Sequence, residues 1–293
     1  MSTTFAWRSM LFVPIVNDRF IQSALKQPAD AIQLDLEDSV ALEQKAQARE
    51  RVTGVAALCA GHGKDVIVRV NRPWRHLLRD IEACICPHVK ALTLPKVPNA
   101  AFVQSVAEII DELEREQGMA PGSTRLIVMV EDAEGLHNMH EIAAAHPRIC
   151  GMIVGAEDLA VSLQMAVSAD TLYVPNVMAV AACRRAGIAP IGFVGSVADF
   201  ADREAFRQTV ERGAALGFEG AFCIHPAQVP IANAAFAPTP AALARAQALI
   251  AAFKAEEAKG RSACTFEGRM VDAPVVKQAQ RIVEKGEAFG IVP

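Results

Sequence analysis

The chain has 293 residues, of which 52% are hydrophobic, only 5% aromatic and 21% charged, and its formal net charge is -4. This balance excludes a disordered chain and disfavours a general nucleic-acid binder, which needs a basic surface. No stretch reaches the roughly 18 apolar residues of a membrane span, and the N-terminus lacks the pattern of a secretory signal. The seven cysteines have no Cys-x-x-Cys spacing. Their scattered positions favour reduced thiols in a cytoplasmic protein. The net charge predicts no nucleic-acid partner and no membrane partner.

Eight short apolar runs, each bounded by polar, glycine or proline residues, are predicted strands. In chain order they are Met10–Val13, Ala31–Leu36, Val66–Val70, Ala91–Leu94, Leu126–Val130, Met152–Val154, Ile188–Phe193 and Ala221–Ile224. Segments with helical periodicity lie between them, among them Leu42–Leu58, Ala101–Arg115, Met178–Arg185 and Ala201–Ala215. This alternation predicts parallel pairing with right-handed crossovers, and eight units predict an α/β protein with a (β/α)8 TIM barrel. An open doubly wound sheet is the alternative, but the first strand runs into Pro14-Ile15-Val16-Asn17 instead of a glycine-rich phosphate turn.

The last part of the chain does not continue this alternation. Thr239-Pro240 predicts a helix start, a polar stretch covers Lys259–Gly268, and a second helix is predicted from about Ala273 to Glu287. We therefore predict a catalytic barrel domain over residues 1–235 and a C-terminal helical extension over residues 236–293. The extension is short for an independent domain and is expected to act as a lid on a barrel, its own or a neighbour's.

Charged side chains follow several of the predicted strands directly, where a TIM barrel carries its chemistry. Glu131 follows the fifth strand and Asp158 the sixth, so both are expected at one mouth. Two carboxylates that leave room for water suit Mg²⁺. Glu37 and Asp38, after the second strand, could hold metal-bound waters. The alternative for all four is a helix cap or a loop charge.

Arg69 lies within the third predicted strand, in the run VIVRVN. An arginine among β-branched residues needs a partner, and a substrate carboxylate or thioester oxygen would serve as a bidentate acceptor. A structural ion pair with Glu37 or Asp38 is the alternative.

Several segments together resemble the citrate lyase beta-subunit-like family, within the group of Mg²⁺-dependent HpcH/HpaI aldolases and acyl-CoA lyases. They are RSMLFVP at 8–14, LDLEDSV at 34–40, RVN at 69–71, LPKV at 94–97, VMVEDAEG at 128–135, GAEDLA at 155–160 and GFEGAFCIHPAQV at 217–229. The resemblance covers nearly the whole chain in order, and the motifs together make it specific. It implies a barrel, chemistry at a carbon–carbon bond next to an acyl thioester, and a homo-oligomer such as a trimer or hexamer.

The resemblance also assigns residues. It implies Mg²⁺ as cofactor with Glu131 and Asp158 as its ligands, and coenzyme A as part of the substrate. The expected catalytic residues are Arg69, Asp272, Glu37 and Asp38. The expected substrate contacts are Arg69, Glu131 and, for the coenzyme A phosphates, Arg8, Arg19 and Lys45, with solvated surface charge as the alternative for the last three.

The expected reaction is retro-Claisen cleavage of a 3-hydroxy-3-carboxyacyl-CoA to acetyl-CoA and a 2-oxo acid. Arg69 would stabilise the enolate oxygen, and Asp272, supplied by its own or a neighbouring subunit, would protonate the enolate carbon. The segment from Thr171 to Phe200 resembles coenzyme-A-thioester lyases, which favours a stand-alone enzyme for citramalyl-CoA, then malyl-CoA. Gln164 stands where the family has a glycine.

Three alternatives stay open. One is a beta subunit that acts on citryl-acyl carrier protein within a citrate lyase complex. The second is a free-acid class II aldolase, and the third is a barrel retained as a binding protein.

Overall fold

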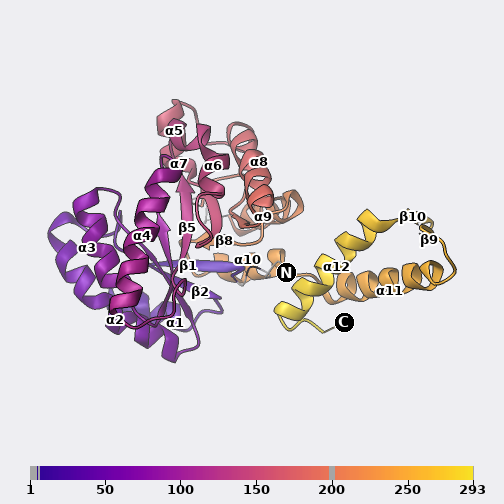
Figure 1. Cartoon of the computed structure of the whole chain (residues 1–293), viewed down its shortest axis with the longest axis horizontal. Coiled ribbons are helices and arrows are strands. Elements are labelled where there is room, and N and C mark those ends of the chain that lie inside the picture. The colour runs from indigo at the N-terminus through magenta and orange to yellow at the C-terminus, as the bar shows by residue number, and fades with distance from the viewer. Residues whose placement is uncertain (1–4, 6, 198–201, 293) are drawn as a thin grey trace. The chain divides into compact units, whose positions relative to one another are not determined.

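The computed structural model describes residues 5, 7–197 and 202–292, and its strands form a nearly closed (β/α)8 barrel (Figure 1). All eight are parallel and follow the order β7-β6-β5-β4-β3-β2-β1-β8. Their bounds are β1 Ser9–Pro14, β2 Ala31–Asp35, β3 Asp65–Arg69, β4 Val89–Leu94, β5 Arg125–Val130, β6 Ile149–Val154, β7 Ala189–Ile191 and β8 Ala221–Cys223. A parallel bridge between Ile191 and Gly220 connects β7 to the residues before β8. The predicted TIM barrel is confirmed.

Helices surround the strands (Figure 1). They are α1 Asp18–Leu25, the short 3-10 helix η1 Leu42–Gln44, α2 Lys45–Gly61, α3 Trp74–Cys84, α4 Ala100–Glu116, α5 Ala133–His137, α6 Met139–Ala143, α7 Ala156–Leu163, α8 Ala169–Ala186, α9 Arg203–Leu216 and α10 Gln228–Phe236. Side-chain caps fix several starts: Asn17 accepts from Phe20 and Asn99 from Phe102, and Ser168 forms a capping box with Thr171. The helix predicted from Ala201 begins at Arg203, and Ala201 itself lies outside the described residues.

The strands are buried because each has the barrel interior on one face and helices on the other. Every residue of β2, β7 and β8 is buried, which explains the continuous apolar runs of β7 and β8. One polar pair lies in this interior, where Thr93 Oγ1 donates to Gln33 Oε1 at 2.9 Å. Since all strands run the same way, the residues that directly follow them share one rim of the barrel. We call this rim the mouth.

From Ala234 onward the chain belongs to a second compact unit. Helix α11 (Pro240–Glu257) starts at the predicted cap, where Thr239 accepts from Ala242, and α12 (Ala273–Ala288) matches the last predicted helix. Leu249 and Phe253 pack there with Val276 in a small core. An antiparallel hairpin of β9 (Cys264–Phe266) and β10 (Arg269–Val271) was not predicted. The domain boundary after residue 235 and the lid role stay predictions.

Burial lowers the reactivity of the cysteine thiols. All seven carry free thiols, and burial raises the pKa of Cys183 and Cys223 to about 12. These thiols are therefore protonated at neutral pH and are poor nucleophiles. Among the described residues, no helix combines the length and the apolar character that crossing a membrane requires.

Candidate active site at the mouth of the barrel

Arg69 is the last residue of β3, and it is held by Asp35, the last residue of the neighbouring strand β2. Nε donates to Oδ1 at 2.7 Å and Nη2 donates to Oδ2 at 2.9 Å, so the pair is bidentate. Only 2% of the Asp35 side chain is exposed. Burial would raise the pKa of Asp35, but the hydrogen bonds and charge of Arg69 hold it below its ordinary value. The guanidinium also lies over the Phe12 ring, 4.9 Å from the centroid. Arg69 is therefore held rigidly.

Glu37 and Asp38 complete the surroundings of Arg69. Nη1 of Arg69 lies 2.9 Å from Glu37 Oε2 and 3.2 Å from Asp38 Oδ2. The structural pairing left open by the sequence is thus present, although its strongest member is Asp35. Neither Glu37 nor Asp38 caps a helix, since the caps of η1 and α2 are Ala41 and Gln44.

Lys45 holds the loop that carries Glu37. Its Nζ donates to the carbonyl oxygens of Leu36 at 2.7 Å and of Glu37 at 2.6 Å. Burial lowers the pKa of Lys45 from its ordinary value. The ammonium therefore positions this loop, and the coenzyme A phosphate contact of Lys45 stays a prediction.

Glu131, directly after β5, is buried with only 4% of the residue exposed. Its Oε2 accepts the backbone N–H of Lys96 at 2.7 Å. Burial raises the pKa of Glu131 to about 7 despite that hydrogen bond, and the charges of Glu37 and Asp158 add to the rise. A Cβ at Gly155 would lie 2.5 Å from Glu131 Oε1, so only glycine leaves room for this carboxylate.

Asp158 lies in the first turn of α7, and 45% of its side chain is exposed. Neither Glu131 nor Asp158 is a helix cap, because Asp132 caps α5 and Gly155 precedes α7. The helix-cap alternative is thereby removed for both.

Lys96 bridges the carboxylates at this rim. Its Nζ donates to Glu37 Oε1 at 3.1 Å and lies 3.7 Å from Asp158 Oδ2. Burial alone would lower the pKa of Lys96, but Glu37 and the other nearby carboxylates raise it, so the side chain is a cation. Five carboxylates (Asp35, Glu37, Asp38, Glu131 and Asp158) thus gather around the two cations Arg69 and Lys96.

The donor set fits Mg²⁺ in one particular mode. No group of three or more His, Cys, Asp or Glu side chains within the described ranges is arranged to hold a metal ion. Mg²⁺ does not need such a group, because it takes one or two carboxylates and completes its shell with water and substrate oxygens. Glu131 and Asp158 supply such a pair, and the excess of negative charge at the mouth favours a divalent cation.

Three sequence candidates remain, namely Arg8, Arg19 and Asp272. Arg8 precedes β1, at the end of the barrel opposite the mouth, and forms a bidentate pair with Asp30. The structure therefore does not bring Arg8 to the proposed site. Arg19 is exposed in the first turn of α1, after the mouth end of β1. Asp272 belongs to the C-terminal unit and caps α12, where Oδ1 accepts from Val275 at 3.4 Å.

Three residues that shape the site were assigned no role in it from the sequence. Asp35 anchors Arg69, Gly155 makes room for Glu131, and Lys96 contacts three carboxylates with its amide and its ammonium. A usable signal existed for the first two, since Asp35 is a charge within an apolar strand and Gly155 directly precedes an acidic pair.

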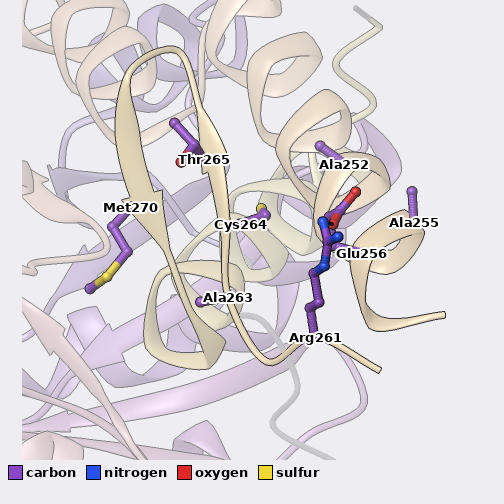
Figure 2. A pocket seen from close by; sticks show the side chains of 8 residues that line it. All are labelled: Ala252, Ala255, Glu256, Arg261, Ala263, Cys264, Thr265 and Met270. Atoms are coloured by element: carbon purple, nitrogen blue, oxygen red, sulfur yellow. Dashed lines mark hydrogen bonds and ion pairs between the residues drawn. The ribbon is translucent and has the colours of Figure 1, made fainter. Parts of the chain in front are cut away.

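A groove of about 650 Å³ lies elsewhere, in the C-terminal unit (Figure 2). It is lined by Ala252, Ala255, Glu256, Arg261, Ala263, Cys264, Thr265 and Met270. Its one carboxylate is already paired, because Arg261 Nη1 lies 2.6 Å from Glu256 Oε2. No candidate site residue lines this groove.

The sequence of the chain is similar to those of known proteins. The model of the HpcH/HpaI aldolase/citrate lyase family matches residues 8–226. The L-malyl-CoA/beta-methylmalyl-CoA lyase of Cereibacter sphaeroides is 34% identical, over 96% of this chain and 94% of that protein. The citrate lyase subunit beta of Leuconostoc mesenteroides subsp. cremoris is also 34% identical, over 97% of this chain and 95% of that protein. A (3S)-malyl-CoA thioesterase of Cereibacter sphaeroides is 35% identical, over 97% and 95%.

A solved structure is also similar to this chain. Protein CitE of Mycobacterium tuberculosis, in complex with magnesium, acetoacetate and coenzyme A, superposes with a TM-score of 0.73 at 30% identity. The match covers 95% of this chain and 97% of that chain.

Proposed function

The chain belongs to the HpcH/HpaI aldolase/citrate lyase family, and from that premise we propose that it is a Mg²⁺-dependent carbon–carbon lyase for acyl-CoA thioesters. The observation that carries the proposal is the pair of carboxylates, Glu131 and Asp158, which follow the neighbouring strands β5 and β6 at the mouth where β3 ends in the fixed guanidinium of Arg69. When bound, Mg²⁺ would supply Lewis-acid polarisation of substrate oxygens.

Arg69 has the properties of an electrostatic stabiliser. Asp35 takes the Nε and one Nη2 hydrogen, and Glu37 and Asp38 face Nη1. Within the described residues the second Nη2 hydrogen meets no protein acceptor. A preoriented donor of this kind stabilises negative charge that develops on a thioester oxygen, because it needs no reorganisation during the reaction.

The proposed substrates are coenzyme A thioesters of 3-hydroxy-3-carboxy acids. The sequence favours citramalyl-CoA ahead of malyl-CoA, and the lyase relative is named for malyl- and beta-methylmalyl-CoA. Citramalyl- and methylmalyl-CoA each carry one methyl group more than malyl-CoA, at different carbons, and a pocket discriminates one methyl group by only about 1–3 kcal/mol. We therefore propose the class, with citramalyl-, malyl- and methylmalyl-CoA as its members to be compared.

A substrate panel tests the proposal. Citramalyl-, malyl-, methylmalyl- and citryl-CoA are each incubated with the chain and Mg²⁺, and both the 2-oxo acid and free thiol are measured. Carbon–carbon cleavage releases pyruvate from citramalyl-CoA or glyoxylate from malyl-CoA and leaves the thioester intact. Release of thiol without a 2-oxo acid would instead indicate thioester hydrolysis, the reaction for which one relative is named. Chelation should abolish 2-oxo acid release.

Extending the panel to citryl-acyl carrier protein and to free hydroxy acids, with a measurement of ligand binding, separates the alternatives. Activity only on a carrier-protein thioester would indicate a citrate lyase beta subunit, as in the Leuconostoc relative's name. Cleavage of free hydroxy acids would indicate a free-acid aldolase. Ligand binding without any turnover would favour a retained binding protein.

We also propose that the C-terminal unit acts as a lid, in an oligomer such as a trimer or hexamer, and that Asp272 protonates the enolate carbon.

Asp272→Asn tests the proposed role of Asp272 as a general acid, because asparagine is as good a helix cap as aspartate but is not an acid. We expect turnover to fall at least about 100-fold, the usual contribution of a general acid, with Mg²⁺ affinity and melting temperature unchanged. Unchanged turnover would remove Asp272 from the mechanism.

A further inference from the structure

One residue contacts both proposed magnesium ligands. The backbone N–H of Lys96 donates to Glu131 Oε2 at 2.7 Å, and its ammonium lies 3.7 Å from Asp158 Oδ2 while donating to Glu37 Oε1 at 3.1 Å. The positive charge of this side chain therefore lies among the oxygens that would receive the metal ion.

The backbone of Lys96 is held in an unusual conformation. Its φ is 49°, in the left-handed region that residues with a side chain rarely adopt. Arg72 Nε donates to the Lys96 carbonyl oxygen at 3.0 Å, so the amide and the carbonyl are both fixed. Strain of this kind persists where the surroundings determine it, most often at functional sites.

The side chain, in contrast, has a route to water. About 35% of it is exposed, whereas only 8% of the Glu37 side chain is exposed. An ammonium and Mg²⁺ repel each other at these distances and compete for the same oxygens. The ammonium can leave without any movement of the fixed backbone.

We propose that Lys96 is a built-in competitor of Mg²⁺: its ammonium neutralises Glu37 and Asp158 in the metal-free protein and turns towards solvent when the metal enters. This inference rests on the magnesium site of the proposed function, but it concerns metal binding and not turnover. Lys96 is thus a positioning residue that sets metal affinity.

Lys96→Met tests the inference by isothermal titration of the full chain with MgCl2. Removal of the competing charge should tighten the Mg²⁺ Kd about tenfold or more, whereas loss of a merely structural residue would weaken it. The melting temperature should fall in EDTA, because the carboxylates lose their counter-charge, and Mg²⁺ should raise it by more than in the wild type. Lys96→Arg, which keeps the charge, should restore the wild-type Kd.

Lys90→Met is the matched control. Lys90 lies on the same strand, β4, at the end away from the mouth, and is exposed. The Kd of Lys90→Met for Mg²⁺ should equal that of the wild type. Suppose that the wild type binds Mg²⁺ and that Asp158→Asn abolishes this binding. An unchanged or weaker Mg²⁺ affinity of Lys96→Met then overturns the inference about Lys96 and leaves the proposed metal site intact. Wild-type binding that persists in Asp158→Asn overturns the proposed metal site and the inference together.

A measurement on the wild type avoids dependence on folding of the variant. Lysines are labelled with acetic anhydride, with and without saturating Mg²⁺, and Lys96 and Lys90 are quantified by peptide mass spectrometry. If the metal displaces the ammonium, Mg²⁺ should raise the Lys96-to-Lys90 labelling ratio several-fold. A constant or falling ratio overturns the inference.

Discussion

Glu131→Gln is expected to abolish Mg²⁺ binding and 2-oxo acid release while it makes the metal-free protein more stable. Glutamine keeps the shape of the side chain, so its carbonyl oxygen can still accept from the Lys96 amide at the position of Oε2. It has no charge, and a neutral amide is a poor ligand for Mg²⁺. Titration calorimetry and the substrate panel would measure both losses.

The gain in stability follows from the raised pKa. Burial lifts the pKa of Glu131 from 4.5 to about 7, so the carboxylate is disfavoured in the folded state. Because the pKa of Glu131 is higher in the folded state than in the unfolded state, the protonated carboxyl stabilises the folded protein fully at pH values below the unfolded-state pKa. This stabilisation is lost as the pH rises to about 7. Metal-free wild type should therefore lose stability between pH 4.5 and 7, by roughly 1–3 kcal/mol. Glu131→Gln should escape this loss, and its melting temperature in EDTA at pH 8 should exceed that of wild type by several degrees.

Glu114→Gln is the control for this argument because its buried carboxylate has the opposite shift. Arg148 and backbone amides hold the pKa of Glu114 at about 2, although burial acts against this, and Arg148 Nη2 lies 2.6 Å from Oε2. Its replacement removes the buried carboxylate partner of Arg148 and leaves the guanidinium with the half-exposed Asp111 as its remaining ion-pair partner, which should destabilise the protein at pH 8. If Glu131→Gln destabilised the metal-free protein equally, the carboxylate would be a structural group and not a metal ligand held at a cost.

The barrel could be predicted because its signal is repeated and local. Each strand is a short apolar run buried on both faces, and eight of them alternate with helices, so small errors at the ends do not change the topology. The run Ile188–Phe193 illustrates this: only Ala189–Ile191 forms β7, yet the strand is present and in place. The hairpin after α11 was missed because its strands have three residues each and its two-residue turn is Glu267-Gly268, where both residues have positive φ. Glutamate is an unusual residue for that turn position.

The sequence could predict which residues lie at the mouth of the barrel but not which of them form ion pairs with one another. The end of a strand brings Glu37, Glu131 and Asp158 to one rim in any barrel. Which carboxylate binds Arg69 depends on the register of β2 with β3, where Asp35 lies opposite Arg69. The family resemblance likewise implied Arg8 as a contact of the coenzyme A phosphates, with surface charge as the alternative, and its position before β1 places it at the end of the barrel opposite the mouth. Pairing across strands is a long-range property, so a single sequence carries it only through the fold.

Arg69→Lys is expected to lower kcat by about 100- to 1,000-fold, the range seen when one preoriented donor to a developing oxyanion is lost. A lysine keeps the charge but not the planar fork, so it cannot make both hydrogen bonds to Asp35 and still present an N–H to substrate. Mg²⁺ affinity should change little, because Arg69 contacts neither Glu131 nor Asp158 among its hydrogen bonds and ion pairs in the described residues. Steady-state kinetics on the best ester of the panel, with calorimetry for the metal, would measure both.

Arg49→Lys separates catalysis from stability in this test. Arg49 Nε binds the fully buried Asp80 at 2.6 Å, a second arginine–aspartate pair with similar burial that lies between α2 and α3. The same substitution there should lower the melting temperature about as much as Arg69→Lys, because each leaves a buried carboxylate with an imperfect partner. Its kcat per folded molecule should stay at the wild-type value. Full kcat in Arg69→Lys would show that the fork serves only to hold Asp35, whereas equal losses of kcat in both variants would trace the effect to stability.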